Sequence, residues 1–457
     1  MMRADLTDDD VHLIIDHMIA DDRQHGQAAE FVWASLTAGE GPAMVTLAGI
    51  QLWLWWLLPK RSIGDPVEWA EAATAGTDLF TRLGEARYAD VFRSDTTRKV
   101  FSAWAKSRSD GVRACRAAQG TSGVEPPDLA DFEWGDTFGS WELRAREAVE
   151  LALEEAIDDG RLKPGAKGWR EVASGICSQV LDHTEPGSVG QTWRTLVVSE
   201  RADTWAGRHA TPVQREARRT IARQYLARPE APTDEVAAAL MAPLVWLAGH
   251  CREGVTLTAS HYLPPVLMHE ALDLFGWADK FSKPRSEADV PQLVDLRAVA
   301  NRLKVVHRKH RRLAVGNAGL ALLADPQRLW NPWVDELGGD NPYDVAASEL
   351  TALALLGHPT GDMPDDELRT LVGQALVEQG WRHADEPARF EDHDYAAFHA
   401  VRRWQLWGVA RFVRARWEAT PTGPKVVEPA SMQLTEMGRV ALSHWLHRRI
   451  TGPQSLR

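Results

Sequence analysis

The chain has 457 residues and a mass of 50.8 kDa, which is more than one hydrophobic core usually serves, so about three to four domains are expected. Apolar residues make up 44% and charged residues 25% of the chain, near the averages of globular proteins, which excludes wholesale disorder, collagen and a polytopic membrane protein. The net charge of −12 implies repulsion from nucleic acid unless the positive charges gather in one place.

Three further features of the composition narrow the class. The three cysteines form no C-x-x-C pair, which excludes a disulfide framework and a structural zinc ribbon. The first residues are acidic where a signal peptide is basic and then apolar, so a cytoplasmic protein is expected. The 20 tryptophans favour core packing over an aromatic ligand cage, because no cluster of them is accompanied by convergent polar residues.

The first part of the chain, 1–122, is predicted to be a helical domain. Asp8, Asp9 and Asp10 are typical first-turn acids ahead of an apolar run. The apolar stretch 43–58 has 16 residues, fewer than the roughly 20 that a membrane-spanning helix needs, so it predicts a buried core helix and no membrane contact. Further helices are predicted over 27–37, 66–83, 96–106 and 109–119.

A second helical domain is predicted over 123–232, because the segment 120–128 is a break rich in glycine and proline. The proline-containing segment 228–233 is predicted to be a linker, with Thr233 as the N-cap of the helix that follows. The helices of this domain are predicted over 141–158, 168–182, 190–205 and 211–227.

The third domain, 233–335, has the order of elements that is typical of a winged helix-turn-helix. The third helix of such a module meets the major groove of DNA, and its two-stranded wing meets the backbone. The pattern predicts a helix over 235–251, a short strand over 254–258, helices beginning at Leu263 and Ser286, a hairpin over 304–315 and a closing helix after Asn317.

The fourth domain, 340–457, repeats this order. The two closing segments align with Gly319 over Gly438, which indicates a duplicated unit of about 120 residues. Helices are predicted over 348–356, 365–379 and 395–407, followed by a strand over 409–417, a tip at 420–424, a return strand and a helix from Leu434. The predicted fold is therefore mainly α, with N-terminal helical domains followed by two winged-helix-like domains with short β-wings.

Five segments of the chain resemble an uncharacterised actinobacterial family related to plasmid pRiA4b Orf3-like proteins. They are LWLWWLLPKR (52–61), GVEPPDLADFEWGD (123–136), RAREAVELALEEAIDDGRLKPGAKGWR (144–170), GVTLTASHYLPPVL (254–267) and KPRSEADVPQLVDLR (283–297). The resemblance implies a helical N-terminal part followed by winged-helix-like repeats, and it implies no activity and no catalytic residues. The family's wing-to-helix pattern, Leu-Thr-x-x-Gly-Arg, is lost in the first copy at Gly316 and Leu320.

Positive charge is concentrated in two runs, 296–320 and 401–417, neither of which contains an acid. Both runs cover a predicted third helix and wing, so their cations predict contacts with DNA phosphates that weaken with salt. Arg297 and Arg302 lie on the first predicted recognition helix, and Arg402 and Arg403 lie on the second. The first wing carries Arg308, Lys309, Arg311 and Arg312, and the second carries Arg411, Arg414 and Arg416.

Three interpretations of these runs remain open at the level of sequence. The first is a non-enzymatic cytoplasmic protein that binds double-stranded DNA or acts as a regulator through the two winged-helix-like domains. The second is a scaffold or adaptor whose winged helices bind a protein partner, because this fold serves both purposes. The third, and least favoured, is an enzyme with an unrecognised site. Exposed basic residues on a common face would favour the first, and basic residues buried against acids would favour docking.

No catalytic, cofactor or metal site is predicted. The nucleophile elbow G-x-S-x-G, the phosphate loop G-x-x-x-x-G-K-[ST] and a G-x-G-x-x-G after a strand are all missing from the sequence. The pairs His444 with His447 and His393 with His399 could ligate zinc only if a third ligand converged on them, and histidines near helix ends usually face water, so no metal site is predicted. The three cysteines lie in apolar helical contexts and are expected to be inert buried thiols.

Overall fold

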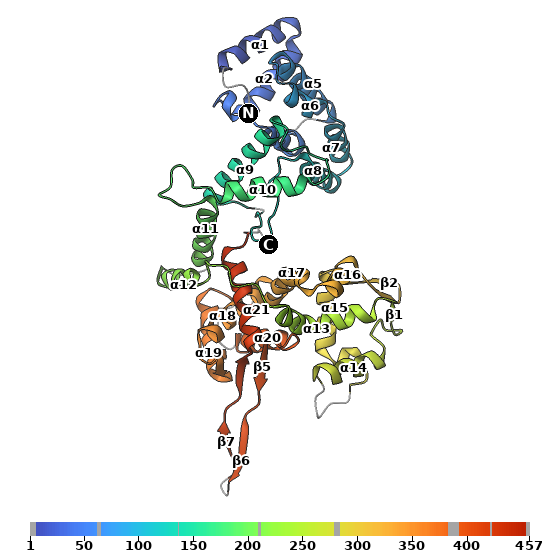
Figure 1. Ribbon diagram of the computed structural model, residues 1–457, viewed down its shortest axis with the longest axis vertical. Helices are drawn as coiled ribbons and strands as arrows, with labels where there is room; N and C mark the ends of the chain where they lie inside the picture. The colour runs from blue at the N-terminus through green and yellow to red at the C-terminus, as the bar shows by residue number, and fades with distance from the viewer. Residues whose placement is uncertain are drawn as a thin grey trace. The chain divides into compact units, whose positions relative to one another are not determined.

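The computed structural model describes residues 6–61, 65–135, 137–208, 212–277, 284–382, 393–420 and 423–453 (Figure 1). These residues are mainly helical with small antiparallel sheets, which confirms the predicted mainly α class. The chain divides into two compact units, Met1–Glu200 with Pro453–Arg457 and Arg201–Gly452, called unit 1 and unit 2 below. The division into four domains stays a prediction.

Unit 1 is built from helices alone, apart from isolated bridges, within the residues described. Its first helix begins at Asp8 because Thr7 and Asp10 form a capping box, as the acidic first turn predicts. Its elements are α1 (Asp8–Asp21), α2 (Arg23–Thr37), η1 (Pro42–Met44), α3 (Leu47–Leu52), η2 (Trp53–Leu57), α4 (Leu58–Arg61), α5 (Pro66–Arg82), α6 (Ala86–Arg93), α7 (Asp95–Lys106), α8 (Arg108–Ser122), α9 (Ser140–Asp158) and α10 (Trp169–Leu181). The helix α11 (Trp193–Gly207) carries the chain from unit 1 into unit 2.

The segment 43–58, predicted to be one buried helix, is largely buried, although Met44 and Leu52 are exposed, and it is not continuous. It consists of η1, α3, the π-helical turn η2 and α4 in succession. Trp53, Leu54 and Trp55 are all buried, although three consecutive side chains cannot share one face of a regular α-helix. The π turn widens the helix at this point, which is consistent with turning all three side chains into the core.

Two hydrophobic clusters fill unit 1, one from residues between 11 and 124 and one from residues between 132 and 197. The buried carboxylate of Glu154 on α9 connects them. It accepts hydrogen bonds from the Leu47 amide at 2.8 Å and from the Tyr88 hydroxyl at 2.7 Å. A buried carboxylate needs such partners, and here they tie α9 to the start of α3 and to α6.

Unit 2 contains the predicted order of helix, strand, two helices, two strands and helix in its first copy. The second copy follows the same order, with an additional pair of strands between its last two sheet strands and with a strand after its first helix that the sequence did not predict. The first copy consists of α13 (Asp234–His250), β1 (Val255–Thr256), α14 (Pro265–Phe275), η3 (Glu287–Asp289), α15 (Pro291–Arg302), β2 (Val306–Lys309), β3 (Arg312–Val315) and α16 (Asn317–Ala324). The second consists of α18 (Pro342–Gly357), β4 (Asp362–Pro364), α19 (Asp365–Glu378), α20 (Ala396–Gln405), β5 (Ala410–Val413), β6 (Arg416–Thr420), β7 (Gly423–Glu428), β8 (Ser431–Leu434) and α21 (Glu436–Thr451). Between the copies lie η4 (Pro326–Leu329), α17 (Trp330–Asp335) and η5 (Glu336–Gly338), and α12 (Pro212–Gln224) precedes both.

The two small sheets of unit 2 have the same topology. Their strand orders are β1-β3-β2 and β4-β8-β5, so in each the last strand lies between the other two. The predicted strand over 409–417 is divided into β5 and β6, and β6 pairs with β7 in a separate ribbon that extends from the second sheet (Figure 1). Pro421 and Thr422 of the predicted tip lie outside the described residues.

One hydrophobic core runs through both copies and includes Trp205, Trp333, Trp404 and Trp445, all nearly inaccessible to solvent. The predicted use of tryptophan in core packing is therefore observed at these positions. Thr233 caps α13 by accepting a hydrogen bond from the Val236 amide, as predicted. Every helix of the described residues is too short or too polar to cross a bilayer.

Candidate nucleic-acid interface

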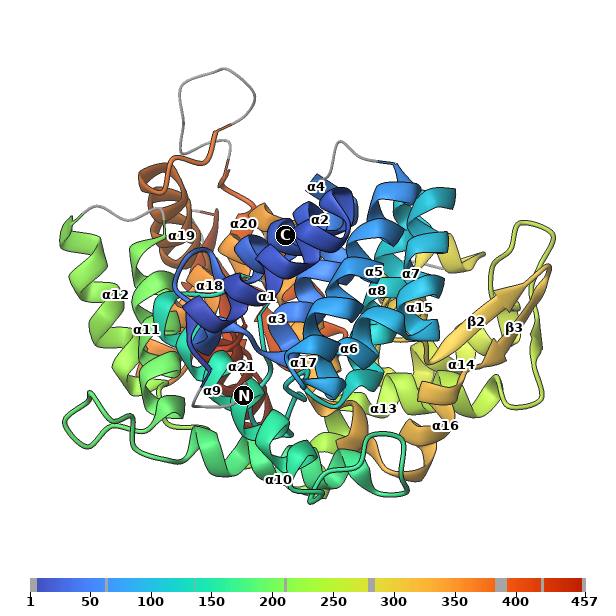
Figure 2. The ribbon, with the colours of Figure 1, turned by 90° about the horizontal axis from the view of Figure 1, so that it is seen from above.

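The β2–β3 hairpin lies at the outer edge of unit 2, beside α14, α15 and α16 (Figures 1 and 2). His310 begins its two-residue turn with a φ of 55°, the left-handed conformation that tight hairpin turns often require. Leu313 and Val306 point into the core, which fixes the register of the hairpin. This register places Lys309 directly opposite Arg312 at the end of the sheet.

All four predicted cations of this hairpin, Arg308, Lys309, Arg311 and Arg312, are exposed. Arg311 donates to the Leu257 carbonyl at 3.0 Å, and Arg312 donates to the Glu253 carbonyl. Within the part of the chain that the structure describes, none of the four forms an ion pair with an acid. Like charges directly opposite each other destabilise a strand pair, so an external anion would relieve the repulsion between Lys309 and Arg312.

Arg297 of the first predicted recognition helix is turned inward instead. Its guanidinium donates to the Glu287 carboxylate at 3.0 Å and to the His261 carbonyl at 2.7 Å. Glu287 is fully buried and also accepts from the Leu263 amide at 2.6 Å. Burial raises the pKa of Glu287, and the Leu263 amide and Arg297 oppose this shift. The pair therefore anchors α15 to the segment before α14.

The helices α15 and α20, which are the two predicted recognition helices, line one hollow of about 520 Å³. Arg302 of α15 forms ion pairs there with Glu336 at 2.6 Å and with Asp340 at 3.0 Å. The two helices thus direct part of their polar faces toward each other. An α-helix needs an unobstructed face to enter the major groove, which is about 12 Å wide.

Arg402 and Arg403 of α20 line the same hollow. Arg403 pairs with Asp344 at 3.3 Å and donates to the Ser348 hydroxyl at 2.9 Å, whereas Arg402 is exposed. Partial desolvation by the walls of the hollow raises the pKa of Asp295, although Arg402 and Arg403 oppose the shift. The structure therefore brings Arg302, Arg402 and Arg403 together, but among acids.

In the second predicted wing, Arg416 has an acidic partner and Arg411 belongs to a chain of polar groups. Arg411 donates to the Gln433 side chain at 2.8 Å, and Gln433 donates in turn to Asp362 at 2.7 Å, so this chain of polar groups crosses the sheet. Arg416 pairs with Glu428 at 3.1 Å, and both are exposed. Arg414 is also exposed. Because an acid already stands beside Arg416, this wing offers less unbalanced positive charge than the β2–β3 hairpin.

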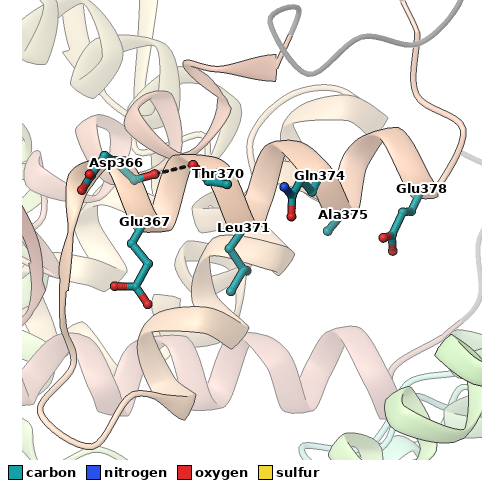
Figure 3. A pocket seen from close by; sticks show the side chains of 7 residues that line it. All are labelled: Asp366, Glu367, Thr370, Leu371, Gln374, Ala375 and Glu378. Atoms are coloured by element: carbon teal, nitrogen blue, oxygen red, sulfur yellow. Dashed lines mark hydrogen bonds between the residues drawn. The ribbon is translucent and has the colours of Figure 1, made fainter.

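The outer face of α19 is acidic. A shallow hollow of about 410 Å³ lies along this one helix. Asp366, Glu367 and Glu378 are among the side chains that line it (Figure 3). Leu371 lies between them and is 44% exposed. A phosphate backbone would be repelled from this face, so the second copy is poorly suited to nucleic acid on the α19 side.

A further basic segment of the chain was not singled out as a candidate site. The helix α12 and the residues on either side of it carry six arginines and one acid, Glu216. The arginines are Arg208, Arg215, Arg218, Arg219, Arg223 and Arg228. This density of arginine is as marked as that of the two runs that were recognised. It precedes the two predicted winged-helix-like domains, so the order of elements gives it no role in DNA binding.

The three cysteines weighed as possible nucleophiles are buried. Of the histidines weighed as possible ligands, His393 and His444 are buried, whereas His447 is half-buried and His399 is exposed. His444 and His447 each contact a backbone carbonyl at 2.7 Å, and His393 contacts the Tyr343 hydroxyl at 3.0 Å. Burial raises the pKa of the Cys115 thiol to about 11 and that of Cys177 and Cys251 to about 12. Across the described ranges, no three side chains of His, Cys, Asp or Glu gather closely enough to hold a metal ion.

No family model, no curated protein and no solved structure matches the chain. The resemblance to the actinobacterial family therefore stays a prediction, and the functional argument rests on the geometry and charge of unit 2.

Proposed function

We propose that unit 2 contains two winged-helix modules and that the chain binds the phosphate backbone of double-stranded DNA through the β2–β3 hairpin. The observation that carries this proposal is the exposed pair of cross-strand cations, Lys309 and Arg312, flanked by Arg308 and Arg311 with no acid paired to any of them in the described chain. The repeated element order and the shared strand order of the two sheets support the winged-helix assignment.

Backbone contact by the wing is favoured over base recognition by the helices. Arg297 and Arg302 are bound to acids, and Arg402 faces the hollow that α15 lines. Contacts to phosphate fix position but carry no direct sequence information. The proposed activity is therefore DNA binding with little dependence on sequence and a strong dependence on salt. Each phosphate contact contributes about −0.9 to the slope of log affinity against log salt concentration.

The test is fluorescence anisotropy of a labelled mixed-sequence duplex titrated with the full chain at several salt concentrations. The decisive variant is R308Q/K309Q, because these two side chains make no hydrogen bond or ion pair within the described structure. The matched control is R93Q/R98Q, which removes the same charge from exposed ion pairs of unit 1. We expect R308Q/K309Q to lower the salt slope by about 2 and R93Q/R98Q to leave it nearly unchanged.

Two results would contradict the proposal. The wild-type chain could fail to bind duplex even at low salt, or the hairpin variant could bind as tightly as the control variant. Circular dichroism of each variant establishes that the fold is retained, so a loss of binding reports on charge and not on folding.

A protein partner is the second candidate, and the face of α19 favours it. Three acids beside the exposed Leu371 would suit a basic segment with one apolar side chain. Under this proposal, L371D would abolish capture of such a segment while R308Q/K309Q would not. A duplex that binds with the expected salt slope, unaffected by L371D, would favour DNA instead.

A further inference from the structure

The hollow that α15 and α20 line is formed by the corresponding helices of the two copies in unit 2. Its volume of about 520 Å³ lies within the range of small-molecule sites, which is about 300–1,000 Å³. Asp295, Ala298 and Arg302 line it from one face of α15, because residues three and four positions apart lie side by side on a helix. The same spacing brings His399 and Arg402 of α20 into the lining.

Most of the charged side chains of the hollow already have a partner of opposite charge. The ion pairs join Arg302 to Glu336 and Asp340, and Arg403 to Asp344. Among the described lining residues this leaves one acid and one arginine, Asp295 of α15 and Arg402 of α20. Both are exposed, and neither forms a hydrogen bond or an ion pair within the part of the chain that the structure describes.

Asp295 and Arg402 carry opposite charges, yet they do not pair with each other. Burial raises the pKa of Asp295, and Arg402 is the strongest of the positive charges that oppose this rise. The two charges therefore interact across the hollow, although the side chains are too far apart for a hydrogen bond. A space with a carboxylate on one helix and a guanidinium on another is complementary to a molecule that is positive at one end and negative at the other.

A small zwitterion matches both charges. Its ammonium group can donate to the Asp295 carboxylate, and its own carboxylate can accept two hydrogen bonds from the planar guanidinium of Arg402. A purely anionic molecule would be repelled by Asp295, and a purely cationic one would be repelled by Arg402. We propose that the hollow binds a free amino acid with an aliphatic body, its ammonium group at Asp295 and its carboxylate at Arg402.

The rest of the lining suits an aliphatic body. Val299, Leu406 and Trp407 line the hollow and are buried, so the methylene groups of a ligand would meet an apolar wall. His399 lies one turn before Arg402, is exposed, and forms no hydrogen bond among the described residues. It can therefore donate a further hydrogen bond to the carboxylate of the ligand.

The competing explanation is that water alone solvates Asp295 and Arg402 and that the hollow is a simple gap between the two copies. The two explanations differ in their response to molecules that carry one charge or both. A solvated gap has no preference among such molecules. A zwitterion site is stabilised by a molecule that bridges α15 and α20, so the ligand would raise the melting temperature of unit 2 in a saturable way.

The test measures the melting temperature of the full chain against glycine, 4-aminobutanoate and 6-aminohexanoate, with sodium chloride making up a constant ionic strength. The three probes span a range of separations between the ammonium and the carboxylate. Each is compared with the amine and the carboxylate of the same length, which for 6-aminohexanoate are hexylamine and hexanoate. We expect a saturable rise with at least one zwitterion, and at least a tenfold weaker affinity for both of its single-charge counterparts.

Two variants assign the two ends of the ligand. D295N should bind the carboxylate without the amine about as well as the zwitterion, and R402Q should do the same for the amine without the carboxylate. Both residues are exposed and without a hydrogen bond in the described structure, so both variants are expected to fold. The matched controls are D273N and R252Q, which remove the same charges from exposed positions of unit 2 outside the hollow.

The proposal would be overturned if no zwitterion had a saturable effect on the wild type, or if D295N and R402Q kept the preference of D273N and R252Q. It does not rest on the proposed binding of DNA, because the β2–β3 hairpin does not line the hollow. R308Q/K309Q is therefore expected to keep the response to the zwitterion even if the DNA proposal fails. D295N is expected to keep the salt-dependent binding of duplex even if the hollow binds no zwitterion.

Discussion

Gly319 and Gly438 occupy the same structural position in the two copies of unit 2. A Cβ atom on Gly319 would lie 2.3 Å from the Val305 carbonyl oxygen, and one on Gly438 would lie 1.8 Å from the Val409 carbonyl oxygen. In each copy this carbonyl, just after the third helix, also accepts a hydrogen bond from the start of the closing helix, from Gly316 at 2.8 Å and from Thr435 at 3.0 Å. The closing helix therefore packs directly against backbone in both copies, which gives a physical reason for glycine at the aligned position.

Replacing either glycine by alanine is expected to destabilise unit 2. The neighbouring atom is a backbone carbonyl and cannot move aside as a flexible side chain could, so the closing helix must shift. We expect G438A to lower the free energy of unfolding by about 2–3 kcal/mol and G319A by somewhat less. Denaturant unfolding followed by circular dichroism measures the change.

The matched control is G249A, in the helix α13 of the same unit. Among the described residues, no atom outside the backbone of α13 itself lies within 4 Å of the Cβ position of Gly249, so alanine should be neutral or stabilise by about 0.5 kcal/mol. Equal destabilisation by G249A and G438A would show that the close approach to the Val409 carbonyl has no special consequence.

Much of the fold follows from local pattern. Most helix boundaries, the cap at Thr233 and the hairpin over 304–315 are specified by neighbouring residues and are observed. The helices predicted over 27–37 and 348–356 begin four and six residues earlier, at Arg23 and Pro342, and α6 was not predicted. The strand β4 was not predicted, because it has three residues and ends in a proline. The π turn within 43–58 was not predicted either, since it depends on which faces of the helix the folded core covers.

The candidate site was harder to predict from the sequence, because the acidic partners of its arginines come from distant segments of the chain. Arg302 lies in a run without acids, yet Glu336 and Asp340 neutralise it from beyond the hairpin. Arg218 and Arg449 meet at Glu349 only in the folded chain. A count of charges along the chain identifies where cations are dense, but it does not say which of them the fold has already paired.

Removing Arg297 is expected to destabilise unit 2 in a manner that depends on pH. R297Q leaves the fully buried Glu287 without its cation, a change expected to lower the free energy of unfolding by about 3 kcal/mol at pH 8. Burial already raises the pKa of Glu287, so the folded protein tolerates this residue better when it is protonated. The free energy of unfolding therefore falls as pH rises and Glu287 ionises. The loss in R297Q should therefore be smaller at pH 5 than at pH 8.

Denaturant unfolding of the wild type, R297Q, E287Q and the double variant R297Q/E287Q at both values of pH checks this prediction. The double variant should be less destabilised than the sum of the two single variants, because it leaves no unpaired buried charge. Additive losses that do not change with pH would contradict it.

Glu150 of α9 is expected to give unit 1 a separate pH dependence. Burial raises the pKa of Glu150 to about 7, and the negative charge of Glu125 adds to this rise. The ion pair with Arg146, at 2.9 Å, opposes the rise but does not cancel it. A raised pKa in the folded state means that stability falls as pH rises from about 4.5 through 7. E150Q cannot ionise, so it should lack this fall and be more stable than the wild type at pH 8, by on the order of 2 kcal/mol.

The control for Glu150 is E155Q, an exposed glutamate on the same helix, which should retain the pH dependence of the wild type. Thermal unfolding between pH 5 and pH 8 provides the measurement. Parallel stability curves for E150Q and the wild type across this range would show that Glu150 is not the group responsible.

Acid is expected to destabilise unit 2 through His447. This pH dependence is opposite in direction to that of Glu150, because the folded state lowers the pKa of His447. Burial is the main cause of its lowered pKa, and Arg228 and Arg448 add to the effect, while the contact with the Tyr225 carbonyl opposes it. Because the unfolded chain takes up a proton near pH 6.5 and the folded chain does so only at lower pH, stability is full above 6.5 and falls as pH decreases. One such group contributes a slope of up to about 1.4 kcal/mol per pH unit.

H447Q should flatten the stability curve between pH 7 and pH 5, whereas H17Q, on the exposed face of α1, should preserve it. If H447Q instead kept the full acid sensitivity of the wild type, the protonation of His447 would not be what loosens the contact between α21 and the end of α12.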